Sequence, residues 1–215
     1  MKHYKILLMG LLAVLFGCGQ KTNLSEKEIQ ICNSVSFDRS LAEKIKKETG
    51  NEIVLIPQIS EYGEVLKEKG DGLCSKTTEQ GSYRFVADNK LFFKGKGYLL
   101  FVFEDDNREY YLATKKGADE LDILRWRQTN GINYDLENKD VIAKLESWKS
   151  KYDFIILGAG MDWLQLKFIA TAPDFNTFAN EVYEFCPDIV DQGTGDIPTL
   201  VRELKKINGV YLWWD

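Results

Sequence analysis

Residues 154–171, "FIILGAGMDWLQLKFIAT", contain two different strand patterns on either side of a short turn. The first, "FIILGA", is wholly apolar, as expected for a strand that is covered on both faces. After the turn the pattern alternates, with Leu164, Leu166 and Phe168 on one side and polar residues between them. This stretch therefore predicts a hairpin whose first strand is covered on both faces.

A second hairpin is predicted over residues 98–114, "YLLFVFEDDNREYYLAT", where two apolar and aromatic runs flank a polar turn. The "EDDN" in that turn lacks the spacing of a calcium loop and predicts a polar hairpin tip. Residues 97–128 and 153–185 each show a hairpin followed by a helical pattern, although their sequences share almost no identity. The predicted fold class is α+β, a mostly antiparallel sheet with packed helices and a possible weak hairpin–helix pseudo-repeat.

The first half of the chain has weaker patterns. Residues 38–48 predict a helix and residues 52–57 a short strand. We expect another short helix over 61–70, "EYGEVLKEKG", ended by Gly70, and irregular structure over 71–96. This half is expected to continue the same sheet.

The stretch "GVYLWWD", residues 209–215, follows a helix stop and predicts the strand that closes the sheet. Strand alternation gives two opposite sets of three: Val210, Leu212 and Trp214 against Tyr211, Trp213 and Asp215. One set belongs in the core. The other is either covered by a helix or forms an aromatic patch suited to a protein contact or a small ligand. Burial of both tryptophans is the favoured alternative.

Residues 1–17 have the features of a targeting segment, with Lys2 and Lys5 before an apolar run that is too short to span a membrane. The run ends in "LFGC", which resembles a bacterial lipoprotein signal. This resemblance implies cleavage before Cys18 and lipid attachment to its thiol, so that membrane lipid becomes a partner through acylated Cys18. An ordinary secretory signal that contains a cysteine is the alternative.

The predicted domain organisation is a signal peptide over 1–17, a flexible tether over 18–30 and a single α+β domain over 31–215. The expected location is the bacterial cell envelope, lipid-anchored to a membrane on its periplasmic or surface side.

Composition excludes several chemistries once the signal is removed. Without Lys2 and Lys5, 28 basic side chains become 26 against 33 acidic ones, a formal charge of −7, so no nucleic-acid partner is predicted. His3 is the only histidine, so the mature chain has none for a catalytic triad or a zinc site. We predict no cofactor and no metal, leave the catalytic residues unknown, and lean against an enzyme.

Three further cysteines follow Cys18. Cys32 and Cys74 lie in polar or loop-like surroundings and are the natural candidates for a disulfide in an exported chain. Cys186 follows an apolar helix face and is expected to be a buried free thiol.

Residues 128–215 resemble the bacterial domain-of-unknown-function family numbered 4253. The resemblance rests on pieces in a fixed order: "TNGINYD" at 129–135, "VIAKLESW" ending at Trp148, the Asp162 turn, Pro173, "EVYEFCPDIVDQG" at 181–193 and "LWWD". It implies a shared alpha/beta fold and brings no established activity, substrate or cofactor.

The candidate ligand-binding residues lie in three loops and the closing strand: Asn130, Asn133, Tyr134, Asp135, Asp162, Asp188, Trp213 and Asp215. Each has a structural alternative. The 129–135 loop can simply contain Asx-type turns, and the acids around Asp188 can cap or shape the next helix.

Two hypotheses for function remain open. The first is a membrane-anchored, non-catalytic domain that binds a protein partner, as an accessory or immunity-like module. The second is a carboxylate-based enzyme or a module that binds a metal or small ligand through its Asp-rich loops, which requires those carboxylates to converge in one pocket.

Overall fold

A computed structural model describes residues 23–170 and 172–215. The predicted signal peptide, Cys18 and the first part of the predicted tether lie outside the described residues.

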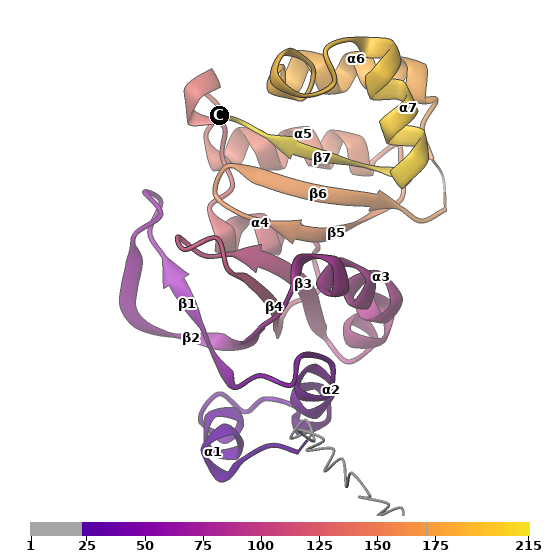
Figure 1. The fold of residues 1–215 in the computed structure, drawn as a ribbon. Coiled ribbons are helices and arrows are strands. Elements are labelled where there is room, and N and C mark those ends of the chain that lie inside the picture. Colours follow the sequence, from indigo (N-terminus) through magenta and orange to yellow (C-terminus); the bar gives the residue numbers. More distant parts are fainter. Residues whose placement is uncertain (1–22, 171) are drawn as a thin grey trace, which may run out of the picture.

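Helices account for much of the described chain and lie on both sides of the sheet (Figure 1). They are α1 (Glu26–Ser34), α2 (Arg39–Thr49), α3 (Glu79–Gly95), α4 (Asp122–Arg127), α5 (Asn138–Lys149), α6 (Phe175–Phe185) and α7 (Ile197–Ile207). Two short turns of other helical types join them: the 3-10 turn η1 (Ile132–Tyr134) and the π-helical turn η2 (Ile189–Thr194).

The strands form one seven-stranded sheet in the order β1-β2-β4-β3-β5-β6-β7. They are β1 (Ile53–Ile59), β2 (Val65–Lys76), β3 (Tyr98–Glu104), β4 (Tyr110–Lys116), β5 (Phe154–Ala159), β6 (Trp163–Phe168) and β7 (Gly209–Trp213). All neighbouring pairs are antiparallel except β3 and β5, which are parallel. The predicted α+β class with a mostly antiparallel sheet is confirmed.

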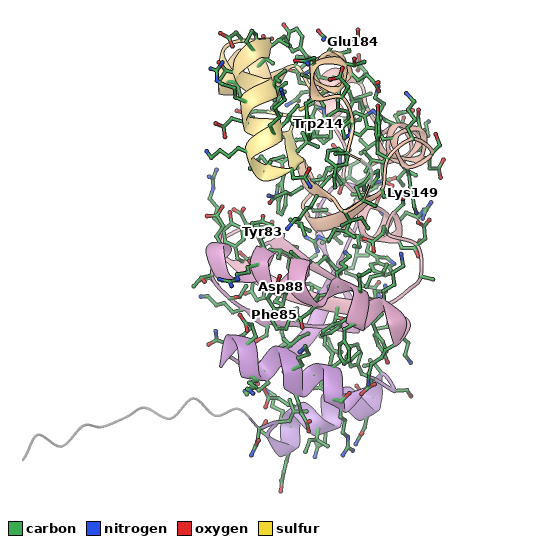
Figure 2. All side chains as sticks on the ribbon, turned by 90° about the vertical axis from the view of Figure 1, so that its right-hand side faces the viewer. Tyr83, Phe85, Asp88, Lys149, Glu184 and Trp214 are labelled. Carbon is green, nitrogen blue, oxygen red and sulfur yellow. The ribbon has the colours of Figure 1, made fainter. Side chains whose placement is uncertain are left out.

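Alternation along the strands creates one core on each face of the sheet. In β3, Phe101 and Phe103 pack into the core with α4–α7, while Leu100 and Val102 pack into the core with α1–α3. Figure 2 shows the two groups of helices, with Phe85 of α3 in one and Trp214 in the other. The wholly apolar run of β5 follows from this arrangement, because its residues enter both cores.

Both predicted hairpin–helix units are present, as β3–β4 with α4 and β5–β6 with α6. The N-terminal half continues the same sheet, as expected, and adds an earlier unit of the same kind, β1–β2 with α3.

The short helix expected over 61–70 is wrong, because this segment is the turn and first part of β2. Ile59 pairs with Val65 at the hairpin end. Gly70 permits close contact with β1 rather than ending a helix, since a Cβ there would lie 2.0 Å from the carbonyl oxygen of Ile56. Strand pairing with β1 outweighs the local pattern.

Residues 71–96 are not irregular either, since they finish β2 and form α3. The helix escaped sequence analysis because polar residues occupy part of its buried face. Ser82 and Lys90 are buried beside Val86 and Phe93, which obscures the apolar periodicity.

Two further expectations fail in the N-terminal region. The tether is shorter than 18–30, because α1 begins at Glu26 with a capping box from Ser25 and Glu28. The expected disulfide is absent: Cys32 and Cys74 are both buried free thiols. They belong to cores on opposite faces of the sheet, so the sheet separates their sulfur atoms.

Candidate functional site

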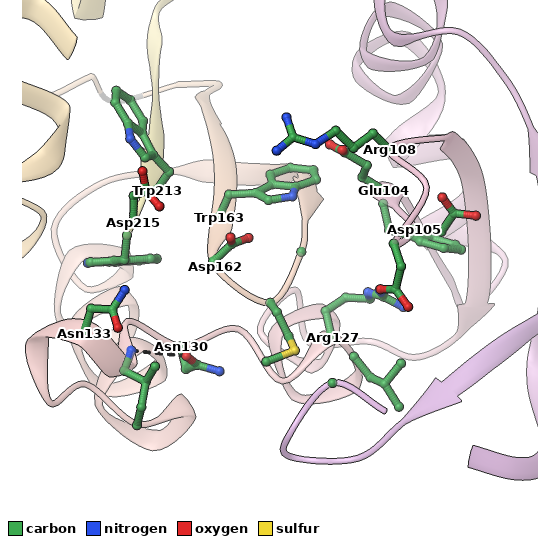
Figure 3. A pocket seen from close by; sticks show the side chains of 18 of the residues that line it. Glu104, Asp105, Arg108, Arg127, Asn130, Asn133, Asp162, Trp163, Trp213 and Asp215 are labelled. Carbon is green, nitrogen blue, oxygen red and sulfur yellow. Dashed lines mark hydrogen bonds between the residues drawn. The ribbon is translucent and has the colours of Figure 1, made fainter. Parts of the chain in front are cut away.

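A cleft of about 690 Å³ lies beside β6 and β7. Four segments line it: the β1–β2 hairpin, the β3–β4 hairpin tip, the loop that contains η1, and the β6–β7 region. Figure 3 shows Trp163 at its centre, with Trp213 and Asp215 on one side and Glu104 and Arg108 on the other. We refer to this feature as the cleft.

The aromatic wall of the cleft comes from the face of β6 and β7 that points away from the core. Trp163 and Trp213 are directly opposite each other in the strand register. The Tyr211 ring lies 5.8 Å from the Trp163 ring and 5.6 Å from the Trp213 ring, centroid to centroid. Tyr211 is 38% exposed and Trp213 is half-buried, so this face remains accessible.

The expected burial of both tryptophans is therefore only half right. Trp214 is 3% exposed, and its Nε1 donates a hydrogen bond to the carbonyl oxygen of Phe185. Trp213 faces the cleft instead. The alternation predicted for this strand explains the difference, because adjacent residues point to opposite faces.

Glycines make room for the aromatic wall. A Cβ at Gly160 would lie 2.2 Å from Nε1 of Trp163, and a Cβ at Gly193 would lie 2.7 Å from the ring of Trp213. Any larger residue at these positions would displace the indoles.

The lining of the cleft carries more acidic than basic groups. Its acidic side chains are Glu104, Asp105, Asp106, Asp162 and Asp215, and its basic ones are Arg108 and Arg127. Asp105 also shapes the hairpin tip, since its Oδ1 accepts hydrogen bonds from the backbone N–H groups of Asn107 and Glu109. The arrangement favours a ligand that presents positive charge or hydrogen-bond donors to the rim.

Five of the eight predicted site residues meet at the cleft: Asn130, Asn133, Asp162, Trp213 and Asp215. Asn133 is exposed there. The Asn130 amide is already bonded within its loop, donating to Gln128 and accepting from the N–H of Ile132. Asn130 thus fixes the loop, in agreement with the structural alternative.

Tyr134 and Asp188 form a structural clamp next to the cleft and do not line it. The buried Asp188 carboxylate accepts hydrogen bonds from the Tyr134 hydroxyl, from Nε2 of Gln192 and from the backbone N–H of Asp215. Burial alone would raise the pKa of Asp188, but these three donors outweigh it and hold the pKa below its usual value. The same hydrogen bond raises the pKa of Tyr134 to about 12.

Asp135 does not contribute to the cleft. It is exposed and ends η1 in the left-handed conformation, with φ 57°. Its role is that of a turn residue, which an aspartate fulfils at little strain.

Sequence analysis missed the hairpin tip at residues 104–108, together with Arg127 and Trp163. The tip was recognised only as a polar turn. It reaches the Asp162 turn because β3 and β5 are neighbours in the sheet, and no local pattern indicates that pairing.

Cysteine thiols and potential metal ligands occur among the described residues. Burial raises the pKa of Cys74 to about 12 and that of Cys186 to about 12, so both thiols stay protonated at neutral pH. Within residues 23–170 and 172–215, no group of three or more His, Cys, Asp or Glu side chains is arranged to hold a metal ion. None of the helices described there is long and apolar enough to cross a membrane.

The fold and the cleft together define an α+β domain with an open, acidic and aromatic cavity beside its closing strands. Residues 111–215 match the family described as Domain of unknown function (DUF4253). The match confirms the resemblance and extends it back to β4. Comparisons with curated proteins and with solved structures gave no match.

The family match divides the cleft into two parts. Arg127, the η1 loop, Trp163 and β7 lie within residues 111–215, whereas the β3–β4 tip and the β1–β2 hairpin precede them. The site is thus completed by the part of the chain outside the family match.

Proposed function

We propose that this protein is a lipid-anchored, non-catalytic binding domain whose cleft receives a positively charged segment of a partner protein. Acylated Cys18 would hold the domain at an envelope membrane, with the cleft available to the partner. An immunity-like role against a basic toxin is one form of this function.

The observation that carries the proposal is convergence. Acidic and aromatic side chains from three segments that are distant in sequence, the β3–β4 tip, the Asp162 turn with Trp163, and β7 with the residues after it, meet around one cavity. A purely solvated acidic surface would have scattered them. The cavity volume of about 690 Å³ suits a ligand or a short segment of a few side chains.

The lining explains the kind of segment expected. Carboxylates of Asp106, Asp162 and Asp215 are exposed at the rim, where they attract lysine or arginine groups. The exposed rings beneath them offer flat surfaces for the stems of the same side chains and for cation–π contact.

The proposal is tested with a defined probe, an amidated and acetylated oligolysine peptide containing one tyrosine, titrated into the protein while backbone amide signals are followed by NMR. We expect saturable shifts at Asp162, Trp163, Tyr211 and Trp213. An oligoserine peptide of the same length and with the same capped ends, which carries no charge, should cause none.

The cleft variant combines Asp106→Asn and Asp162→Asn in one protein. The control variant is Asp88→Asn on α3, because Asp88 is exposed and lies outside the cleft. The cleft variant should weaken peptide binding about tenfold, corresponding to about 1.4 kcal/mol. Equal binding by both variants, or shifts confined to other surfaces, would exclude the cleft as the binding site.

The membrane anchor has its own test. Cys18→Ala should move the protein from the membrane fraction to the soluble fraction and remove labelling by radioactive palmitate. A protein that remains labelled after this change would contradict acylation at Cys18.

A further inference from the structure

Arg127 is a buried cation in the lining of the cleft. It is the last residue of α4 and is 6% exposed, with its guanidinium 4.3 Å from the centre of the Phe103 ring. Burial lowers the pKa of Arg127 to about 10, which still leaves it charged at neutral pH. A permanent charge is therefore held in a largely desolvated position.

Two of its nitrogen atoms, Nε and Nη1, are buried without any hydrogen-bond partner. In the part of the chain described, no carboxylate lies within 4.0 Å of the guanidinium. Asp106 is the acid that acts on it electrostatically, from farther away. An unpaired buried charge is destabilising, so its presence calls for a reason.

The other strongly buried cations of this fold are paired. Nζ of Lys46 lies 2.7 Å from Glu28, and Nζ of Lys90 lies 2.9 Å from Glu120. The chain thus supplies internal carboxylates where a buried cation serves only the fold. Arg127 differs from both lysines in lining the cleft.

We propose that Arg127 anchors an oxyanion of the ligand, a carboxylate or a phosphate group, through its guanidinium. Figure 3 shows the Arg127 side chain on the same side of Trp163 as the β3–β4 tip. The planar guanidinium matches two oxygens of such a group. Contact with the Phe103 ring restrains the guanidinium in the lining of the cleft.

This inference rests on the proposed binding function and makes its ligand more specific. The exposed acids of the rim take a positively charged group, and Arg127 takes a negative one. The ligand therefore carries both a positive and a negative charge at this site. The part of the ligand between the two charges contacts the aromatic rings of the cleft. A peptide end or a phosphorylated side chain beside a lysine has this chemistry.

The test observes the Nε–Hε NMR signal of Arg127 directly, assigned by its loss in Arg127→Lys. Acetate and inorganic phosphate are titrated separately at constant ionic strength, with chloride as the reference anion. We expect a saturable shift of this signal. A response to acetate alone assigns a carboxylate ligand, and a response to phosphate alone assigns a phosphate ligand.

Two variants provide an independent readout. The anion that shifts the signal should raise the melting temperature of the wild type and of Arg202→Met, whose arginine is exposed on α7 and lines no cavity. It should leave that of Arg127→Met unchanged. Arg127→Met is expected to fold, because methionine fills a similar volume without a charge to bury.

No saturable shift with either anion, or an equal rise in melting temperature for Arg127→Met, would overturn the anchor. That result is distinguishable from failure of the proposed function, which is measured with oligolysine at the rim. Loss of peptide binding with a retained Arg127 response would instead contradict the cationic-segment proposal alone.

Discussion

Nζ of Lys90 lies 2.9 Å from Oε2 of Glu120, and neither side chain is more than 2% exposed. The same ammonium group donates hydrogen bonds to the carbonyl oxygens of Leu100 in β3 and Ile156 in β5. Glu120 in turn accepts a hydrogen bond from the backbone N–H of Ile156. Lys90 and Glu120 therefore link β3 to β5, two neighbouring strands that pair in parallel.

The first prediction concerns this junction. Lys90→Met should lower the free energy of unfolding by about 3–5 kcal/mol, because it leaves Glu120 charged, buried and without its closest partner. Lys94→Met is the control, since Lys94 is half-exposed and lies 3.9 Å from Glu120. It should cost about 1 kcal/mol or less. Urea unfolding followed by circular dichroism measures both, and equal losses would show that the junction does not depend on Lys90.

The second prediction separates the two adjacent tryptophans. Trp214→Ala should destabilise the domain by about 3–5 kcal/mol, because a fully buried ring packed against Phe185 is lost. Trp213→Ala should cost only about 1 kcal/mol, since that ring is half-buried and meets the exposed Tyr211 ring at a tilt. Trp213→Ala should nevertheless weaken binding in the cleft. Similar unfolding curves for the two variants would contradict the assignment of faces.

The third prediction is a loss of stability in acid through Glu28. Burial would raise its pKa, but the hydrogen bond from Lys46 and the N–H groups of Ser25 and Ile53 lower the pKa to about 2. A carboxyl whose pKa is lower when folded stabilises above its ordinary value of 4.5 and loses this contribution as pH falls toward 2. The full effect is about 3 kcal/mol.

Glu28→Gln tests it. This variant should be less stable than the wild type at neutral pH and should approach it as pH falls to 2 and below, since the wild-type carboxyl then becomes protonated as well. Glu26→Gln, at an exposed position two residues earlier, should keep the wild-type pH profile. A constant difference between Glu28→Gln and the wild type across this range would remove Glu28 as the cause.

The fourth prediction concerns the cysteines. Cys32, Cys74 and Cys186 should resist iodoacetamide in the folded protein and react fully after denaturation, because all three are buried free thiols. A reducing agent should leave the melting temperature unchanged. Mass spectrometry of the protein denatured without reductant provides the check, and a linked Cys32–Cys74 peptide would contradict the placement of these residues in separate cores.

Sequence patterns located the hairpins of β3–β4 and β5–β6 because both depend on local alternation and turn residues. They failed for α3 and for the first part of β2. In α3, Lys90 is a core residue only because Glu120, far away in sequence, neutralises it. In β2, the partner strand β1 decides the conformation.

The candidate site shows the same division. Asp162, Trp213 and Asp215 were identified as polar or aromatic residues at turns and strand ends, and they do line the cleft. Arg127 carried no signal, because a single arginine at a helix end looks like any solvated charge. Its significance comes from burial and from two nitrogen atoms without partners, which are properties of its surroundings.

By itself, the sequence determined the strand alternation of "GVYLWWD", the apolar character of β5 and the acidic balance of the chain. These depend on neighbouring residues and on composition. Only the tertiary structure decided that Trp214 enters the core while Trp213 faces a cleft, and that the β3–β4 tip lies beside it. The physical reason is that sheet order places residues side by side through pairing between distant strands, which no local pattern of side chains encodes.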